Sequence, residues 1–426
     1  MPHEDTIDAS NPQERDMIDK QAENRKKAVA IFMVIVALSG LALGLTDAVF
    51  SNYFREAFSV YALERGLIEF PRELPGVITV FMVSIFAFMG NRKLAIIAHG
   101  LLIIGIFVMG FASPTFNVML IFLFITSLGM HMFMPLYDSM AMSLAKGEGF
   151  GAAMGRFNGL RTAFGMIAAI LIFVGFRTEF FSFTTPIILN FVIAGVLFTI
   201  ILIMLIFLGR YMEDTKAEKS RFVLKKEYTK FYLLAILFGG RKQIMFVYGP
   251  WVLIELLGFR ADNMALLVIT GAAIGIFFLP IVGRWIDRFG AGKMMTIEAC
   301  LFLTVYLGYG TVSAGISSGW LVGTTALIVL AVGIAVIDQM TMMFGMTRAV
   351  YMRSIALTPE DVTPTLATGM AMDHIVSIGS AIFCGFLWTR LGPQYVFVFS
   401  GVLAIGNLLI ARSIRKENTN DSNEQD

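Results

Sequence analysis

The stretch YTKFYLLAILFGGRKQIMFVYGPWVLIELL, Tyr228 to Leu257, is an apolar run with two adjacent cations near its middle. As a helix rising about 1.5 Å per residue it would be about 45 Å long, enough to cross a bilayer with some tilt. Arg241 and Lys242 would then lie at membrane depth, where a charged side chain costs at least about 2.5–3.5 kcal/mol. The run therefore predicts a transmembrane helix whose cations face a bundle interior or a water-filled cavity.

Arg241, Lys242 and Gln243 are the first candidates for contact with a substrate. Successive helical positions are rotated by about 100°, so the two cations face different neighbours. The alternative is a structural role, in which a buried cation pairs with a carboxylate and holds two helices together. Gly239-Gly240 before the cations and Gly249-Pro250 after them are expected to loosen the helix on both sides.

Composition excludes an ordinary soluble domain. The chain of 426 residues is 57% hydrophobic and 15% charged, with 39 Phe and 27 Met. Its net charge of +2 is too small to indicate a nucleic-acid partner. Cys300 and Cys384 both lie in apolar runs, without metal-ligand spacing or a disulfide framework. We therefore expect no metal site and no cofactor.

Twelve apolar runs are long enough to cross about 30 Å of hydrocarbon as helices. They cover residues 28–52, 67–90, 94–112, 117–143, 157–177, 184–209, 228–257, 263–285, 294–313, 320–346, 366–389 and 394–412. Ser113-Pro114-Thr115 marks a turn within the long apolar segment 94–146. Met1–Glu23 is polar and has no apolar core of a signal peptide, so a disordered cytosolic tail is expected. The predicted class is an all-α integral membrane protein with twelve transmembrane helices.

Lysine and arginine lie mostly in the loops on the side of the two termini, which predicts that both termini are cytoplasmic. The opposite loops contain only Arg55, Arg65, Arg72, Arg177, Arg260 and Arg390. The charged stretch Arg210–Lys230 separates six spans from six, which suggests a duplicated half. We expect six-helix bundles at 28–209 and 228–412, a cytosolic linker at 210–227, and cytosolic tails at 1–27 and 413–426.

The segment Gly283-Arg284-Trp285-Ile286-Asp287-Arg288-Phe289-Gly290-Ala291-Gly292-Lys293 lies between spans eight and nine. It resembles the G-x-x-x-D-R-x-G-R-R loop of the major facilitator superfamily, although Ala291-Gly292-Lys293 departs from its basic ending. The first-half copy is reduced to Gly90-Asn91-Arg92-Lys93 and has no acidic residue. The resemblance implies two six-helix bundles and transport by alternating access. It assigns gating to Gly283, Asp287, Arg288 and Gly290; the alternative is a set of charges that only fixes topology.

In that fold, spans one, four, seven and ten line the central cavity. Four charged residues fall on these spans and are expected to contact substrate: Asp47, Asp138, Arg241 and Asp338. We expect Arg241 to hold either a substrate anion or a carboxylate such as Asp338 or Asp47. Glu298 falls on a peripheral span, which favours a structural or interfacial carboxylate. Glu69, Arg72 and Glu73 crowd the start of span two, and a solvated, mutually paired outer rim is expected.

Asp373-His374, in the inner part of span eleven, is the sharpest candidate for proton coupling, because histidine titrates near neutral pH. As sequence neighbours the two side chains do not face each other, and Asp373 is expected to meet Arg241 or Asp338. The alternative is a carboxylate and a histidine flanking the cytosolic surface. His131 in span four fits a proton site in the cavity and equally a buried histidine with satisfied hydrogen bonds.

Cations at the midplane favour an anionic or zwitterionic substrate, and a wall of methionine and phenylalanine favours an adaptable apolar site. Because the sequence has no P-loop, a substrate gradient or an ion gradient, most simply of protons, is expected to drive transport. The predicted function is secondary transport of a small organic solute by a plasma-membrane monomer. A lipid or lysolipid flippase on the same fold is the alternative. A membrane enzyme or sensor would need a ligand-spaced cluster or a soluble output domain, and neither is apparent.

Overall fold

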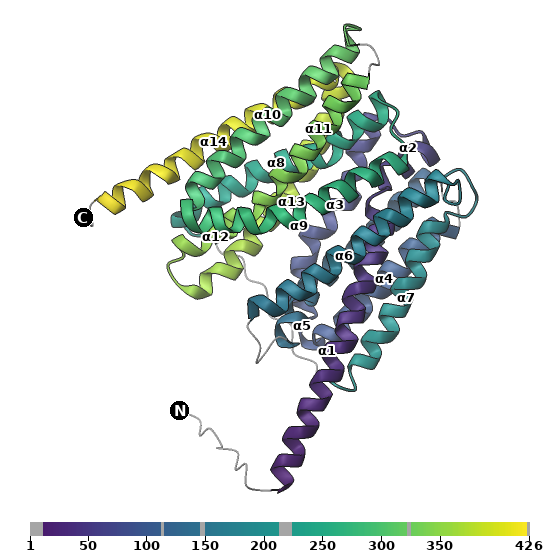
Figure 1. Ribbon diagram of the computed structural model, residues 1–426, viewed down its shortest axis with the longest axis vertical. Helices are drawn as coiled ribbons and strands as arrows, with labels where there is room; N and C mark the ends of the chain where they lie inside the picture. The colour runs from purple at the N-terminus through teal and green to yellow at the C-terminus, as the bar shows by residue number, and fades with distance from the viewer. Residues whose placement is uncertain (1–11, 112–114, 145–149, 213–223, 322–324, 424–426) are drawn as a thin grey trace.

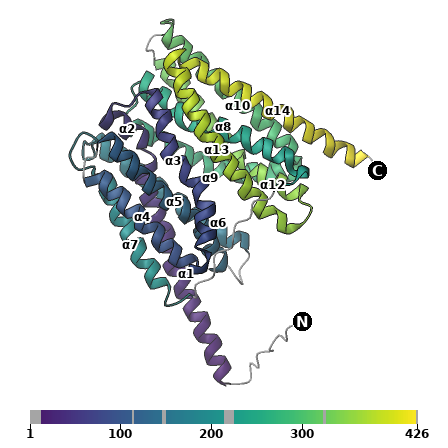
Figure 2. The same ribbon diagram turned by 180° about the vertical axis from the view of Figure 1, so that it is seen from behind.

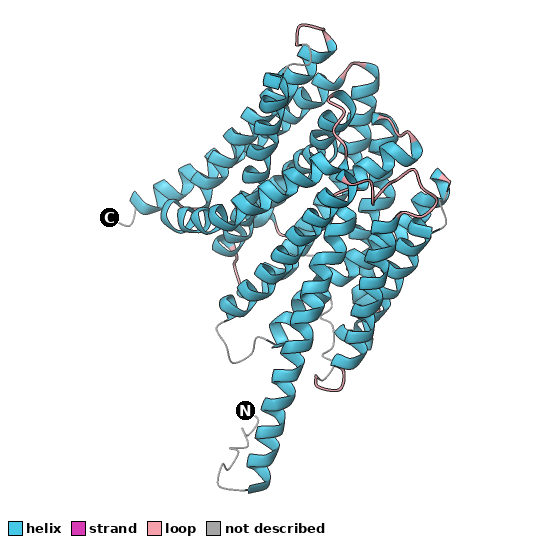
Figure 3. Ribbon diagram, turned by 45° about the vertical axis from the view of Figure 1, so that its right-hand side comes forward, coloured by secondary structure: helices cyan, strands magenta, loops and turns pink. Residues whose placement is uncertain are grey.

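The computed structural model describes residues 12–111, 115–144, 150–212, 224–321 and 325–423. All the regular secondary structure in these ranges is helical (Figure 3). Six predicted features fall partly outside the described residues. They are the N-terminal tail (residues 1–11), the third span (residue 112), the expected turn (Ser113-Pro114), the linker 210–227 (residues 213–223), the tenth span (residues 322–324) and the C-terminal tail (residues 424–426).

Within the described ranges, twelve membrane-crossing segments form two six-helix bundles, which confirms the predicted fold class. The first bundle contains α1 (Pro12–Asp47) followed by the short α2 (Phe50–Phe58), α3 (Ala62–Ile85), the 3-10 turn η1 (Ala87–Met89), α4 (Asn91–Phe111), α5 (Phe116–Leu144), α6 (Phe150–Arg177) and α7 (Leu189–Leu208). The second contains η2 (Lys226–Tyr228), α8 (Thr229–Trp251) with the π-helical turn η3 (Val252–Leu256), α9 (Ala261–Phe289), α10 (Ala291–Ser317), α11 (Thr325–Met342), the 3-10 turn η4 (Met343–Met346), α12 (Thr347–Ile355), α13 (Pro359–Arg390) and α14 (Pro393–Asn423).

Three local expectations are wrong. Helix α1 begins at Pro12, because proline suits the first helical position and the following polar residues are good helix formers. Their helix includes an ion pair between Lys27 Nζ and Glu23 Oε1 at 2.7 Å, one turn apart. The tenth crossing does not end near residue 346 but continues through η4 and α12 to Ile355. Helix α8 runs unbroken through Gly239-Gly240, and only the end near Pro250 departs from α-helical geometry, as η3.

Ten of the described helical segments are long and apolar enough to cross a membrane by composition alone. Helices α3 and α8 are not among them. Each carries several charged residues at membrane depth, and the bundles around them supply partners for those charges. The two crossings that depart most from an ordinary transmembrane composition therefore carry the candidate site.

The bundles pack against each other mainly through α3 with α13 and α6 with α9. We call the end that carries α2 and the start of α3 the distal end, and the end that carries the start of α1 the proximal end. At the distal end a Cβ on Gly66 would lie 2.5 Å from the Ala381 carbonyl oxygen, so glycine permits backbone contact there. Asn52 Nδ2 donates to the Phe259 oxygen at 3.1 Å, also across the bundles.

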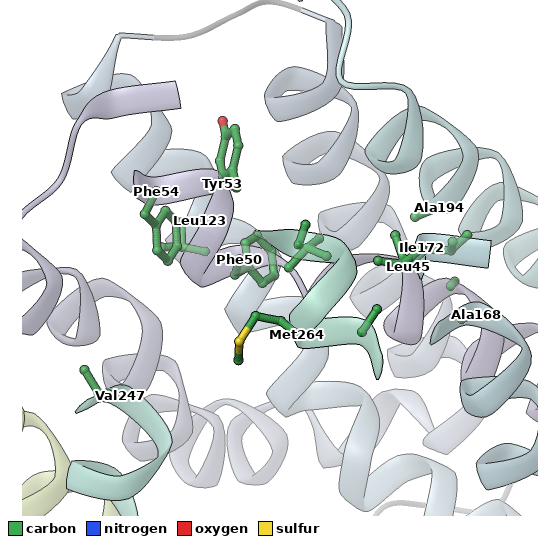
Figure 4. Close-up of a cluster of buried hydrophobic side chains, with 14 of the residues drawn as sticks. Leu45, Phe50, Tyr53, Phe54, Leu123, Ala168, Ile172, Ala194, Val247 and Met264 are labelled. Atoms are coloured by element: carbon green, nitrogen blue, oxygen red, sulfur yellow. The ribbon is translucent and has the colours of Figure 1, made fainter. Parts of the chain in front are cut away.

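One apolar cluster crosses this distal contact. It includes Phe50 and Tyr53 of α2 and Val247 and Met264 of the second bundle. Figure 4 shows Met264 in the same cluster as the aromatic side chains of α2. Hydrogen bonds between the bundles join Asn52 to Phe259, Glu69 to Gln243 and Glu73 to His374. They extend from this cluster to the middle of α3. Toward the proximal side, where α1 and α14 extend beyond their bundles, the two halves lie apart in both views (Figures 1 and 2). The conformation is therefore closed at the distal end.

Candidate functional site

Helix α3 carries a ladder of buried charges, Arg65, Glu69, Arg72 and Glu73. Their spacing places them along one side of the helix. Arg65 and Glu69 form a fully buried ion pair, and Arg72 Nη1 lies 3.4 Å from the same Glu69 oxygen. The expected solvated rim is wrong, although the expected mutual pairing is present. Because α3 begins at Ala62, earlier than predicted, these residues lie inside the protein.

Two of these carboxylates are hydrogen-bonded to the second bundle. Gln243 Nε2 of α8 donates to Glu69 Oε2 at 2.5 Å. His374 Nδ1 of α13 lies 2.8 Å from Glu73 Oε2. Gly76 makes room for this imidazole, because a Cβ there would lie within about 2.7 Å of the His374 ring. Glu69 and Glu73 thus anchor polar cross-links that join the halves.

His131 of α5 completes a group with Glu73 and His374. Its ring centroid lies 5.2 Å from that of His374. The ligand-capable atoms of these three residues all lie within 4.8 Å of one another. His131 Nδ1 is 2.9 Å from the Ser127 carbonyl oxygen, which makes this nitrogen the N–H donor and leaves Nε2 as an acceptor. The arrangement places two imidazoles and a carboxylate, from three helices, where a proton can pass among them.

Asp373 pairs with neither Arg241 nor Asp338, contrary to expectation. Its Oδ2 accepts a hydrogen bond from Lys242 Nζ at 2.8 Å, and Ser377 Oγ donates to its Oδ1 at 3.2 Å. The backbone of Gly239 permits this contact, because a Cβ there would meet the Asp373 Cα at 2.8 Å. Asp373 and His374 contact different partners, as expected for sequence neighbours whose side chains point in different directions from a helix.

Arg241 is fully buried and pairs with Glu298, so the expected pairing with Asp338 or Asp47 is wrong. Its Nη2 donates to Glu298 Oε1 at 2.8 Å, and its guanidinium Cζ lies 3.7 Å from the Phe302 ring centroid. Glu298 is thus the structural carboxylate that its peripheral span suggested. The Asp338 Oδ1 atom is buried without a hydrogen-bond partner among the described residues.

Arg348 is a member of the site that sequence reasoning missed. Its Nη1 donates to the same Glu298 oxygen at 3.1 Å. Its Cζ lies only 3.1 Å from the Phe238 ring centroid. Arg348 lies just beyond the apolar run 320–346, so the charge pattern of the loops predicts it to be a cytosolic flanking charge. The structure shows that the helical crossing continues past Met346 through η4 and α12, and this continuation brings Arg348 to Glu298.

Asp47 and Asp138 lie in the first bundle, apart from this cluster. Asp47 is exposed at a pocket that Thr46, Arg72 and Ser127 also line. Asp138 is exposed on the proximal half of α5. The Arg161 Cζ lies 5.4 Å from the ring centroid of the neighbouring Tyr137. Arg161 and Tyr137 line a second pocket. The structure therefore distributes the four predicted cavity charges over two separate regions.

The predicted gating loop is a single glycine. Helix α9 ends at Phe289 and α10 begins at Ala291, with Gly290 between them at φ +76°, a value that favours glycine. Asp287 and Arg288 are exposed, and no ion pair joins them to each other or to another part of the described chain. Gly283 is half-buried one turn earlier, with open space where a Cβ would stand.

A second charged group ties the end of the linker to the first turn of α13. Lys225 Nζ lies 2.6 Å from Asp361 Oδ2, and the Tyr228 hydroxyl donates to the same oxygen at 2.6 Å. The Leu357 amide in turn donates to the Tyr228 hydroxyl oxygen at 2.9 Å. The hydrogen bond from Lys225 holds the pKa of Asp361 below its ordinary value.

Comparison with known proteins agrees with this architecture. The sequence profile of the Major Facilitator Superfamily matches residues 28–358, whereas no curated protein matches the chain. The solved nucleoside transporter NupG is similar with a TM-score of 0.68 and 12% identity, over 91% of this chain and 98% of that one. A POT family transporter in complex with a thioalcohol-conjugated peptide is similar with a TM-score of 0.72 and 12% identity, over 92% and 96% of the two chains.

A bacterial homolog of the human lysosomal transporter Spinster, in an inward-facing and unoccupied conformation, has a TM-score of 0.63 and 12% identity, over 92% of this chain and 98% of its own. At such identities the structural likeness shows the fold alone. The family profile covers most of the chain, and the twelve crossing segments in two bundles agree with it. The chain belongs to the Major Facilitator Superfamily, a family of membrane transporters.

Proposed function

We propose that this protein is a secondary active transporter that moves a small organic solute, anionic or amphiphilic, by alternating access and is driven by a proton gradient. The observation that carries the proposal is the hydrogen bond between Glu73 of one bundle and His374 of the other, with His131 beside it. A polar link across the distal end must break whenever that end opens. Its strength changes when the imidazole gains or loses a proton.

The coupling follows from the charges of this pair. With His374 protonated, the link to Glu73 is an ion pair that favours the distal-closed conformation seen here. Loss of the proton toward the proximal side leaves a weaker hydrogen bond, so the distal end opens more readily and takes up the next proton there. The charged and titratable neighbours are Arg72 of α3, His131 of α5, Lys242 of α8 and Asp373 of α13. Asp373 takes part indirectly, by holding Lys242 beside the pair.

The remaining assignments complete the proposal. The solute passes between the pockets beside Asp47 and Asp138 and the second-bundle cluster near Asp338. Asp287, Arg288, Gly283 and Gly290 act at the proximal end, where the bundles must approach when the distal end opens. The protein works as a monomer in the plasma membrane, with both termini and the linker 210–227 in the cytoplasm.

The test is transport by the purified full chain in proteoliposomes, first by counterflow with a panel of organic anions and then under an imposed proton gradient. Wild-type protein should accumulate a solute with the gradient. His374→Gln and Glu73→Gln should keep exchange by counterflow but lose accumulation. His3→Gln, a histidine outside the described helices, is the matched control.

Undiminished accumulation by both variants would remove the pair from the mechanism. The same vesicles, loaded with a fluorescent lysolipid, separate the flippase alternative. Proton-independent movement of lysolipid without exchange of any organic anion would replace the proposal with that function.

A further inference from the structure

We propose that the anionic group of the solute binds between Arg348 and Lys242, beside the Phe238 ring, and that Arg241 with Glu298 forms the buried support of this site. The inference rests on the proposed function and deepens it by naming the contacting residues and the class of ligand. It replaces Arg241, the cation to which the sequence first points, with Arg348, which lies in the first turn of α12 directly after the 3-10 turn η4.

The balance of charge singles out Arg348. Arg241 and Glu298 form one pair, and Lys242 and Asp373 form another. Arg348 binds the Glu298 oxygen that Arg241 already occupies, so its own charge has no separate counter-ion in this cluster. Asp338 is a third carboxylate near Arg241, but it forms no ion pair with either arginine among the residues described, and its Oδ1 is buried without a hydrogen-bond partner. A surplus cation at membrane depth is costly, and a bound anion would neutralise it.

The exposed fractions of the side chains also distinguish these cations. The Arg241 side chain is 0% exposed and Glu298 1%, so neither can meet a solute in this conformation. The side chains of Arg348 and Lys242 are 13% and 23% exposed. One N–H of each is used in the ion pairs described. A guanidinium has five N–H donors and an ammonium three, so both cations keep donors for a ligand.

Both cations lie near the Phe238 ring. Arg348 Cζ lies 3.1 Å and Lys242 Nζ 5.9 Å from its ring centroid. The ring is itself half-buried, and it offers an apolar surface next to the free donors. The 3-10 turn η4 ends directly before α12, and a Cβ on Gly345 would lie 3.3 Å from Arg348 Nη2, so glycine leaves room beside the guanidinium. The site therefore suits a carboxylate, sulfonate or phosphonate attached to a flat apolar group.

The experiment measures binding without any gradient, so its failure can be told from a failure of proton coupling. The purified full chain is titrated with three probes of similar shape: phenylacetate, the neutral phenylacetamide and the cationic phenethylamine. Thermal unfolding reports stabilisation by each probe. Arg348→Gln and Arg348→Lys are compared with Lys242→Gln. The matched control is Arg353→Gln, an exposed arginine on the same helix.

We expect phenylacetate alone to stabilise the wild type and Arg353→Gln. Arg348→Gln should raise its Kd at least about tenfold, equivalent to about 1.4 kcal/mol. Arg348→Lys should restore binding only in part, because lysine lacks the planar fork. Arg348→Gln is expected to fold, since the Arg241–Glu298 pair remains neutral; its unfolding temperature without probe checks this.

Three results would overturn the inference: equal binding of phenylacetate by Arg348→Gln, stabilisation of the wild type by the neutral or cationic probe alone, or no stabilisation by phenylacetate. Anion binding with no proton-driven accumulation in vesicles would preserve the site and refute the coupling.

Discussion

Glu298→Gln should be the most damaging single change in the second bundle. The Glu298 Oε1 atom accepts hydrogen bonds from Arg241 at 2.8 Å and Arg348 at 3.1 Å, so the two donor nitrogens lie no more than about 6 Å apart. Without the carboxylate charge, two guanidiniums would face each other across that distance. At an effective dielectric constant of about 20, their repulsion is about 3 kcal/mol. Together with the loss of charge-assisted hydrogen bonds, the expected cost is about 3–5 kcal/mol.

Arg241→Met should cost less, because Arg348 continues to neutralise Glu298 and methionine fills part of the space beside Phe302. The double variant Arg241→Met with Glu298→Gln should be more stable than Glu298→Gln alone. It leaves one arginine, Arg348, which is partly exposed and reaches water. This order distinguishes a carboxylate shared by two arginines from a simple pair, in which both single changes would cost about the same.

The four tryptophans provide the assay. Trp251, Trp285, Trp320 and Trp388 all belong to the second half of the chain, so their fluorescence follows unfolding of that bundle. Unfolding of the purified protein by increasing SDS in mixed micelles then gives the free-energy differences. Glu227→Gln, the same chemical change at an exposed position, is the control and should stay within about 0.5 kcal/mol of wild type. Equal losses in Arg241→Met and Glu298→Gln, or a double variant weaker than Glu298→Gln, would refute the reasoning.

Three further predictions concern other parts of the molecule. Asp287→Asn should slow transport and shift the balance between distal-closed and distal-open states, measured by cross-linking cysteines at the proximal ends of the bundles; unchanged transport and cross-linking would leave the loop a purely topological role. Gly239→Ala should lower stability by about 1–3 kcal/mol, because the new methyl group would meet the α13 backbone, whereas Gly379→Ala on α13 has open space and should be neutral or slightly stabilising; equal unfolding midpoints would show that this close approach is not constrained. Lys225 lowers the pKa of Asp361, so their ion pair stabilises the fold above the ordinary carboxyl pKa, and this stabilisation is lost as the pH falls through the lowered pKa of Asp361. Below about pH 4 the unfolding midpoint of the wild type should therefore fall toward that of Asp361→Asn. A difference between the two midpoints that stays constant down to about pH 2 would contradict this.

The fold could be predicted from sequence because a bilayer leaves so few solutions for an apolar chain. Every long apolar run had to be a helix, and the charge asymmetry of the loops checked their number. The limits of the helices were harder to predict. Helix α3 starts earlier than its apolar run, because Arg65 near its start is a charged residue that the bundle buries. The tenth crossing continues past its apolar run through α12, where Arg348 pairs with Glu298. Hydropathy alone treats such residues as loop.

The sequence predicted which residues belong to the site better than it predicted which of them form pairs. Sequence position placed Arg241, Lys242, Asp373 and His374 at membrane depth, and the structure gives each a partner. The partners differ from those expected, because neighbouring helices are set by packing at glycines such as Gly239 rather than by charge. Small residues permit two helices to approach closely, and the charged side chains then pair with the polar groups that this packing brings within reach.

The way in which the partners divide between the bundles bears on mechanism. Arg241, Glu298 and Arg348 all belong to the second bundle, so a rigid-body rocking of the two halves leaves their contacts intact. The links from Glu69 to Gln243 and from Glu73 to His374 cross the bundles, so in the proposed alternating-access cycle they would break each time the distal end opens. A group that changes its protonation during transport is therefore best sought among the crossing links. A permanent charge that holds the solute is best sought within one bundle, where its geometry stays constant while access to it alternates.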